Sequence, residues 1–266
     1  MRLIQLISIN NIFGEKMKYS YQDIKESMTL EKKKEDSVIA GFVYRPIANF
    51  ISLFLVNWGV SANAISICSV VIVLAACFLL LISSNRTLII AFVLLNLFPV
   101  MDCIDGTIAR TLKKNNPFGD FFDAVGGYTM YSFSLLFICW ASTKRGFVLP
   151  ILSNDFLFFV SAIGSIFSIL PRLIYQRYLV SCFKQYGSIE HSIYEVNNEK
   201  KIGIVKRIVI RINRFIGIGD GYMIILSMAY CLGVINWAIL FYSIYFVFLG
   251  VSSSLLYCIK ASRAIK

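Results

Sequence analysis

The sequence predicts an all-α polytopic membrane protein with six transmembrane helices and an N-terminal amphipathic helix at the membrane interface. Of its 266 residues, 58% are hydrophobic and only 15% are charged, whereas roughly a quarter of the residues in a soluble domain are charged. Five apolar stretches reach the length of about 18 residues that a helix needs to cross a bilayer, and a sixth is shorter. Because these runs are continuous rather than alternating, they argue against an outer-membrane barrel.

Residues 1–42 are polar and mixed in charge, and we expect them to form a cytoplasmic segment ahead of a single membrane domain at 43–266. Pro46 suits the first turn of a helix. Apolar residues then recur at helical spacing on one face: Ile47, Phe50, Ile51, Phe54 and Leu55. This pattern predicts an amphipathic helix lying in the interface, with Trp58 as its anchor.

Six membrane spans are predicted after this helix, at about 62–83, 87–112, 118–142, 151–176, 219–235 and 237–259. The fifth is the short one. A polar stretch at 184–201 and a second amphipathic helix at about 202–216 separate the fourth span from the fifth.

The net charge of +11 is distributed unevenly along the chain. Of the 26 Lys and Arg residues, only Arg86, Lys144 and Arg145 fall in the loops opposite the N-terminus. The positive-inside rule therefore predicts that both termini face the cytoplasm. The Lys-, Ile- and Asn-rich composition favours a bacterial inner membrane, and no soluble basic face indicates nucleic-acid binding.

Carboxylates interrupt the second and third spans near their cytoplasmic ends. Four positions of the second span share one helical face because they stand at i, i+3, i+4 and i+7: Asp102, Asp105, Gly106 and Ala109. Asp120 and Asp123 share a face of the third span. Since the turn between these spans is short, we expect the two helices to be antiparallel and the carboxylates to converge.

Buried carboxylates need compensation, either by protein cations or by a metal. Arg110 is one cation and is too few for the group. Oxygen-only ligands favour Mg²⁺, Mn²⁺ or Ca²⁺, and a carboxylate-held Mg²⁺ commonly binds phosphate groups. The residues alone thus indicate a phosphoryl or pyrophosphoryl site at the cytoplasmic face. A salt-bridge network with Arg110 that only locks helix packing is the structural alternative.

The stretch "DCIDGTIAR", followed by eight residues and "GDFFD", resembles the signature of the CDP-alcohol phosphotransferases, D-x-x-D-G-x-x-A-R-x8-G-x-x-x-D-x-x-x-D. Seven of its eight positions match: Asp102, Asp105, Gly106, Ala109, Arg110, Gly119 and Asp123. In "VSANAIS", Asn63 and Ser66 match the family's usual entry to the first span, where Ala62 replaces a proline. The resemblance covers roughly residues 43–260.

This resemblance implies a transferase that moves a phospho-alcohol group, for example phosphatidyl, from a CDP-alcohol such as CDP-diacylglycerol to an acceptor hydroxyl and releases CMP. It implies phospholipid or lipid-linked glycan synthesis, and a homodimer is one expected assembly. Two ions, Mg²⁺ or Mn²⁺, would be held by Asp102, Asp105 and Asp123. The donor would be bound by the remaining signature positions and the first span: Asn63, Gly106, Ala109, Arg110 and Gly119.

The eighth signature position departs from the family, because Gly127 stands where relatives carry an aspartate given the role of general base. Three interpretations remain open. In an active variant, Asp123, a metal-bound hydroxide or a phosphate of the acceptor takes the proton. In a pseudoenzyme, the chain binds a CDP-alcohol without turning it over and acts as a membrane partner protein. In the third, the carboxylate has moved to Asp120.

An acceptor that carries a phosphate needs cations near the site, and Arg172 and Arg177 at the inner end of the fourth span are the candidates. Further candidate cations precede the fifth span: Arg207, Arg211 and Arg214. Asp220, which opens that span, could contact a substrate or equally cap a helix. Membrane topology accounts for each arginine equally well. A transporter or channel is the rival class, but the acidic cluster lies at helix ends and no internal repeat is visible.

Overall fold

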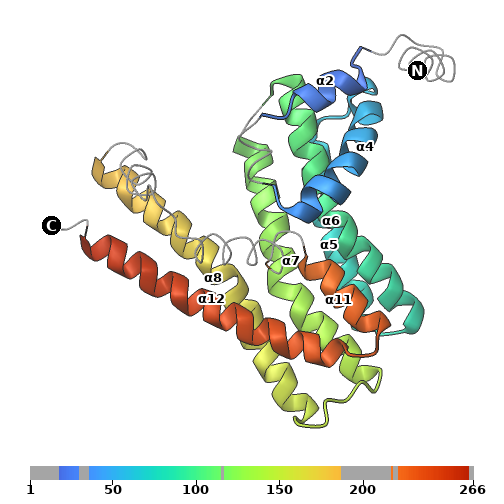
Figure 1. The fold of residues 1–266 in the computed structure, drawn as a ribbon, viewed down its shortest axis with the longest axis vertical. Helices are drawn as coiled ribbons and strands as arrows, with labels where there is room; N and C mark the ends of the chain where they lie inside the picture. Colours follow the sequence, from blue (N-terminus) through green and yellow to red (C-terminus); the bar gives the residue numbers. More distant parts are fainter. Residues whose placement is uncertain (1–17, 30–35, 115–116, 187–216, 218–220, 264–266) are drawn as a thin grey trace. The chain divides into compact units, whose positions relative to one another are not determined.

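The computed structural model describes residues 18–29, 36–114, 117–186, 217 and 221–263 (Figure 1), and these residues form helices and turns without a β-strand. Short helices come first: α2 (Tyr21–Glu26), the π-helical turn η1 (Ala40–Tyr44) and α4 (Arg45–Asn57). Longer helices follow: α5 (Ala62–Ile82), α6 (Asn85–Leu112), α7 (Pro117–Lys144), α8 (Asn154–Tyr186), α11 (Tyr222–Cys231) and α12 (Ile235–Arg263).

Five of these helices, α5, α6, α7, α8 and α12, are long and apolar enough to cross a membrane. Their large side chains remain exposed along much of their length, as Phe78, Val93 and Phe248 illustrate with exposed fractions above 60%. Exposing so many large apolar side chains to water is unfavourable, whereas the hydrocarbon of a membrane solvates them. The predicted all-α polytopic membrane fold is therefore confirmed.

The predicted count of six spans is not confirmed, because α11 has 10 residues, about 15 Å of helix, against the roughly 30 Å of a hydrocarbon core. The chain turns at Gly233, whose φ of 73° lies in the left-handed region, and α12 begins at Ile235. Part of the predicted fifth span and the whole predicted amphipathic helix at 202–216 lie outside the described residues.

The predicted end of the fourth span at residue 176 is also wrong as a helix boundary, since α8 continues to Tyr186. Pro171 lies inside α8 and does not end it. A proline removes one backbone hydrogen bond and leaves the rest of the helix to continue. Arg172 and Arg177 therefore lie within a helix rather than at its end.

The chain divides into two compact units. The first contains residues 1–70 and 97–124, and the second contains 71–96 and 125–266, so that α5, α6 and α7 each contribute a part to both. Within the first unit, α2 packs on α4 through Ile24, which is almost fully buried. Asn57 of α4 adds a polar clasp: its Oδ1 accepts from the Tyr19 amide at 3.0 Å and its Nδ2 donates to the Tyr19 carbonyl at 3.0 Å.

Helix α4 has two unlike faces, as the predicted amphipathic helix requires. Its buried side carries Tyr44 at the junction with η1, then Ala48 and Leu53. Apolar side chains on the other side are exposed, including Ile47, Phe50 and, just after the helix, Trp58. Pro46 lies in its first turn, as predicted. The interfacial location and the boundary between a 1–42 segment and a 43–266 membrane domain stay predictions.

In the second unit, α8 and α12 pack along each other for much of their length (Figure 1). Small residues permit the close approach. A Cβ at Gly164 would lie 2.7 Å from the Cα of Ser243, and a Cβ at Gly250 would lie 2.5 Å from Cδ1 of Phe167. Neither position has room for a side chain.

Polar side chains join other helices of the second unit. The Tyr222 ring is fully buried in edge contacts with Tyr242 and Phe246, and its hydroxyl lies 3.1 Å from Oγ of Ser134 on α7. Asn236 of α12 accepts from Oγ of Ser142 at 2.8 Å. Because each polar group finds a partner inside the protein, none of these bonds requires water within the hydrocarbon layer.

We predict that Gly164→Ala lowers the stability of the second unit by about 1–3 kcal/mol, since the added methyl group overlaps backbone of α12 that cannot rotate away. Thermal unfolding in detergent measures the effect. Gly41→Ala is the matched control, because a Cβ at Gly41 has no atom within 4 Å. Equal melting temperatures for the two variants would contradict the close packing of α8 on α12.

Candidate active site

Asp105 is the buried member of the carboxylate cluster. It lies on α6 in the first unit with 8% of its surface exposed. One carboxylate oxygen accepts a hydrogen bond of 2.6 Å from Oγ of Ser66 on α5. This bond connects the carboxyl group of the signature to the neighbouring helix α5. Ser66, noted in the sequence only as part of the entry to the first span, is therefore the residue that holds this carboxylate.

The other carboxylates lie differently. Asp102 on α6 is exposed, and so are Asp120 and Asp123 in the first turns of α7. Among the described residues, no three His, Cys, Asp or Glu side chains lie close enough together to hold one metal ion. The structure therefore does not bring Asp102, Asp105 and Asp123 together as a three-carboxylate group. The donor atoms are all oxygens, which suits Mg²⁺ or Mn²⁺.

Arg110, the cation of the signature, folds back along α6. Its Nη2 donates a long hydrogen bond of 3.3 Å to Oγ1 of Thr107, and its Nη1 lies 3.1 Å from where a Cβ of Gly106 would be. The signature glycine thus makes room for the signature arginine. The Nε of Arg110 is buried and has no hydrogen-bond partner among the described residues. A buried donor of this kind is uncommon in folded proteins and calls for an explanation.

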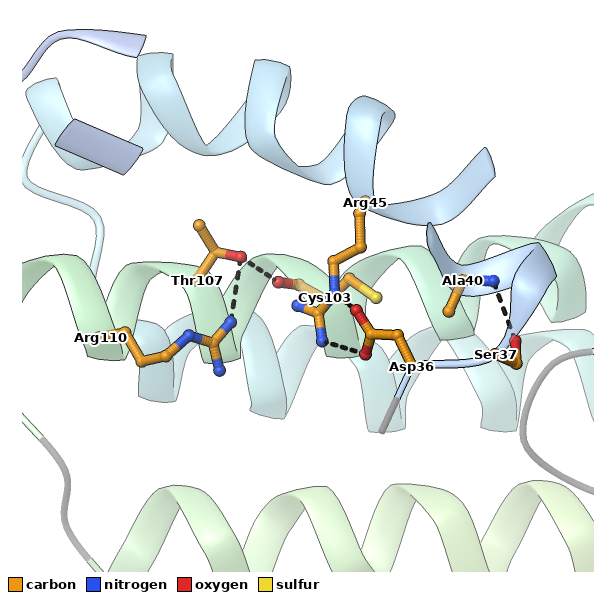
Figure 2. A network of polar contacts seen from close by, with 7 residues as sticks. All are labelled: Asp36, Ser37, Ala40, Arg45, Cys103, Thr107 and Arg110. Atoms are coloured by element: carbon orange, nitrogen blue, oxygen red, sulfur yellow. Dashed lines mark hydrogen bonds and ion pairs between the residues drawn. The ribbon is translucent and has the colours of Figure 1, made fainter. Parts of the chain in front are cut away.

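A second arginine, Arg45, reaches α6 from the start of α4 (Figure 2). Its Nε and Nη2 each donate a 3.0 Å hydrogen bond to the two oxygens of Asp36. Both side chains are only 9% exposed. No pattern in the sequence marks this pair, since Asp36 ends the charged run "EKKKED" and Arg45 precedes an apolar stripe.

The charge of Arg45 is strongly stabilised. Burial acts to lower the pKa of this guanidinium, but the bidentate hydrogen bond to Asp36 and the negative charges nearby, Asp102 among them, raise the pKa above its ordinary value. Arg45 and Arg110 are also close enough for their positive charges to repel each other, while Asp36 attracts both. Arg45 therefore stays ionised, and its field acts on the signature.

Gly127 belongs to the second unit, one turn after Asp123 along α7. The guanidinium of Arg172 on α8 lies over it: a Cβ at Gly127 would be 3.2 Å from Nη1 of Arg172. The same guanidinium stacks on the Tyr131 ring at 4.6 Å from its centroid. A cation thus lies against the position where the family signature has a carboxylate, and glycine leaves the space that it occupies.

The remaining predicted residues are accessible to differing degrees. Asn63, Ala109 and Gly119 are half-buried, and Arg177 is exposed on α8. Their roles in donor and acceptor binding stay predictions. Four acceptor candidates lie outside the described residues: Arg207, Arg211, Arg214 and Asp220.

The apolar helices define an integral membrane protein, and it carries a carboxylate signature at the end of α6 and the start of α7 with two arginines on α4 and α6. Comparison with protein families supplies the particular class: residues 59–249 match the CDP-alcohol phosphatidyltransferase family. The chain belongs to this family. No curated protein matches the chain as a relative. Family membership supports transfer of a phospho-alcohol group from a CDP-alcohol to an acceptor hydroxyl in lipid synthesis.

We predict that Ser66→Ala lowers the free energy of unfolding by about 1–3 kcal/mol, because it leaves the buried Asp105 carboxylate without its hydroxyl donor. Thermal unfolding in detergent measures this loss. Ser66→Thr keeps the hydroxyl and should retain most of the stability. Ser69→Ala is the control, since the Ser69 hydroxyl donates only to the Ser66 carbonyl. A loss in Ser69→Ala as large as in Ser66→Ala would contradict a special role for the carboxylate bond.

Proposed function

We propose that this chain is an active CDP-alcohol phosphotransferase that depends on a divalent metal ion and uses an anionic acceptor. The observation that carries the proposal is the family match across residues 59–249, which includes the signature on α6 and α7. The acceptor oxygen bonds to the phosphorus that bears the donor alcohol. The bond from this phosphorus to the bridging oxygen breaks, and CMP leaves with the electron pair.

Asp102, Asp105 and Asp123 are the proposed ligands of Mg²⁺ or Mn²⁺. Support comes from their all-oxygen chemistry and from the burial of Asp105, whose charge has a hydroxyl as its hydrogen-bond donor. When bound, the ions would neutralise charge on the donor pyrophosphate and on the departing CMP. The signature residues Ala109 and Gly119 are small and half-buried, which suits close approach of the donor. Gly106 gives room to the guanidinium of Arg110, which would supply N–H donors for phosphate oxygens.

Arg172 is the proposed acceptor-binding residue, and Arg177 is a further candidate on the same helix. Tyr131 positions the guanidinium of Arg172 by stacking beneath it. Among the described residues, no carboxylate forms an ion pair with Arg172. An anionic acceptor, such as one carrying a phosphate, would neutralise the positive charge of Arg172. The proton of its attacking hydroxyl would pass to Asp123 or to a phosphate oxygen of the acceptor itself, since Gly127 offers no base.

The alternative function is that of a CDP-alcohol-binding pseudoenzyme which serves as a membrane partner. One observation favours it: a guanidinium lies against position 127, and a cation cannot accept the acceptor proton.

The direct test measures CMP release by the purified chain in detergent–lipid micelles. CDP-diacylglycerol and soluble CDP-alcohols serve as donors, with phosphorylated and unphosphorylated hydroxyl acceptors. We expect release that needs Mg²⁺ or Mn²⁺ and falls by at least about a hundredfold in Asp105→Asn, which removes a proposed metal ligand. Arg86→Ala, at an exposed position away from the site, is the control. Binding of CDP without CMP release from any pair would favour the pseudoenzyme.

Gly127→Asp tests the acceptor assignment. Because its Cβ would lie 3.2 Å from Nη1 of Arg172, we expect the new carboxylate to pair with this arginine rather than act as a base. The KM for a phosphorylated acceptor should rise about tenfold or more, as in Arg172→Ala, while the donor KM stays unchanged. Gly127→Ala controls for the added methyl group. If Gly127→Asp instead releases CMP while the wild type releases none, the chain is an impaired enzyme that lacks its base.

A further inference from the structure

Arg45, at the start of α4, is a buried charge that lies beside the signature but precedes the residues of the family match. Arg45 and Asp36 both precede residue 59, where the match begins. Among the described residues, Arg45 and Asp105 are the charged side chains that are buried, each with 8% of its surface exposed. Both belong to the first unit. Burying a guanidinium is costly, so its position requires a physical explanation beyond attachment of a surface helix.

Asp36 satisfies only one edge of the Arg45 guanidinium. It accepts hydrogen bonds from Nε and Nη2, which leaves Nη1 on the edge of the guanidinium that Asp36 does not occupy. Figure 2 shows Asp36 on one side of this guanidinium and Arg110 on the other, with Cys103 and Thr107 of α6 along the same side of the helix. Residues 103, 107 and 110 share a face at helical spacing.

The two guanidinium groups repel each other, and Asp36 is the nearby counter-ion that attracts both. Arg110 has a single hydrogen bond of 3.3 Å to Thr107 and a buried Nε with no partner among the described residues. Asp102 also attracts Arg45 and Asp105 attracts Arg110, so the two positive charges are partly compensated, but the buried Nε of Arg110 still lacks an acceptor among the described residues. Phosphate is the anion that arginine forks fit best.

We propose that Arg45 and Arg110 together bind the pyrophosphate of the donor, with Arg45 contributed by the N-terminal helix and Asp36 as its resident counter-ion. This inference deepens the proposed function and rests on it for the identity of the anion. The segment from Asp36 to Arg45, through the Ser37-capped turn that begins η1, becomes part of the donor site. The competing explanation is a latch in which the Asp36–Arg45 pair only fastens the segment before η1 to the start of α4.

The two explanations differ in what happens when each partner of the pair is removed. Arg45→Ala should weaken the binding of CDP and of inorganic pyrophosphate about tenfold to a hundredfold, the loss expected for a charged hydrogen bond. Asp36→Asn keeps one acceptor oxygen for Arg45 but removes the competing negative charge, so it should bind CDP at least as tightly as the wild type. A latch predicts that both substitutions weaken binding and lower the melting temperature equally.

The experiment is isothermal titration of the full chain in detergent and Mg²⁺ with CDP, pyrophosphate and cytidine. Cytidine lacks phosphate, so its affinity should not depend on Arg45. Arg86→Ala is the control for loss of an arginine. Arg45→Lys keeps the charge and loses the fork; it should bind CDP with intermediate affinity, and it carries the test if Arg45→Ala does not fold. CMP release is measured in parallel, with the donor KM expected to rise and the acceptor KM to stay constant.

The outcomes separate this inference from the proposed function. If the wild type releases CMP and Arg45→Ala leaves the CDP affinity and the donor KM unchanged, the role of Arg45 in binding the donor is overturned while the transferase activity stands. Arg45-dependent CDP binding in a wild type that releases no CMP overturns the transferase and leaves the arginine pair standing. Equal losses in Asp36→Asn and Arg45→Ala support the latch and overturn the inference. A wild type without affinity for CDP or pyrophosphate overturns both proposals.

Discussion

An ionisable side chain loses favourable hydration when it leaves water, and the first unit carries this cost at Arg45 and at Asp105. Each has a specific partner: Asp36, nine residues before Arg45, accepts two hydrogen bonds from its guanidinium, and Ser66 donates to Asp105. The first bond pair fixes the segment before η1 to the start of α4, and the second joins α5 to α6. These hydrogen bonds are the reason that ionisable side chains are tolerated in and beside the apolar helix α6.

Glycine has the same function at two separate positions. At Gly106 and at Gly127, a guanidinium lies 3.1 Å and 3.2 Å from where a Cβ would be. Arg110 is the neighbour of Gly106 and Arg172 that of Gly127. The lost carboxylate at 127 is thus coupled to a cation from another helix. A carboxylate at 127 would meet this guanidinium, so the residue at position 127 and Arg172 are structurally dependent on each other.

The positions of the spans along the sequence could be predicted where a long apolar stretch defines the helix, as in α5, α6, α7 and α12. The prediction went wrong at α8 because it ended the span near Pro171, whereas the remaining hydrogen bonds continue the helix to Tyr186. It also treated 219–235 as one span, although the helix there ends at Cys231 and Gly233 turns the chain. A single glycine within an apolar stretch does not reveal from the sequence that the chain turns there.

Apolar length and motif spacing were enough to predict the membrane class, the positions of most spans and the signature with its missing aspartate. Helical periodicity and apolar length are local properties, so Asp102, Asp105 and Gly106 could be assigned to one face without any structure. The folded chain was needed to show that Ser66 donates to Asp105 and that Arg172 lies over Gly127, because these partners stand on different helices and meet only through helix packing. It was also needed for the Asp36–Arg45 pair, because the turn between these two residues brings them together.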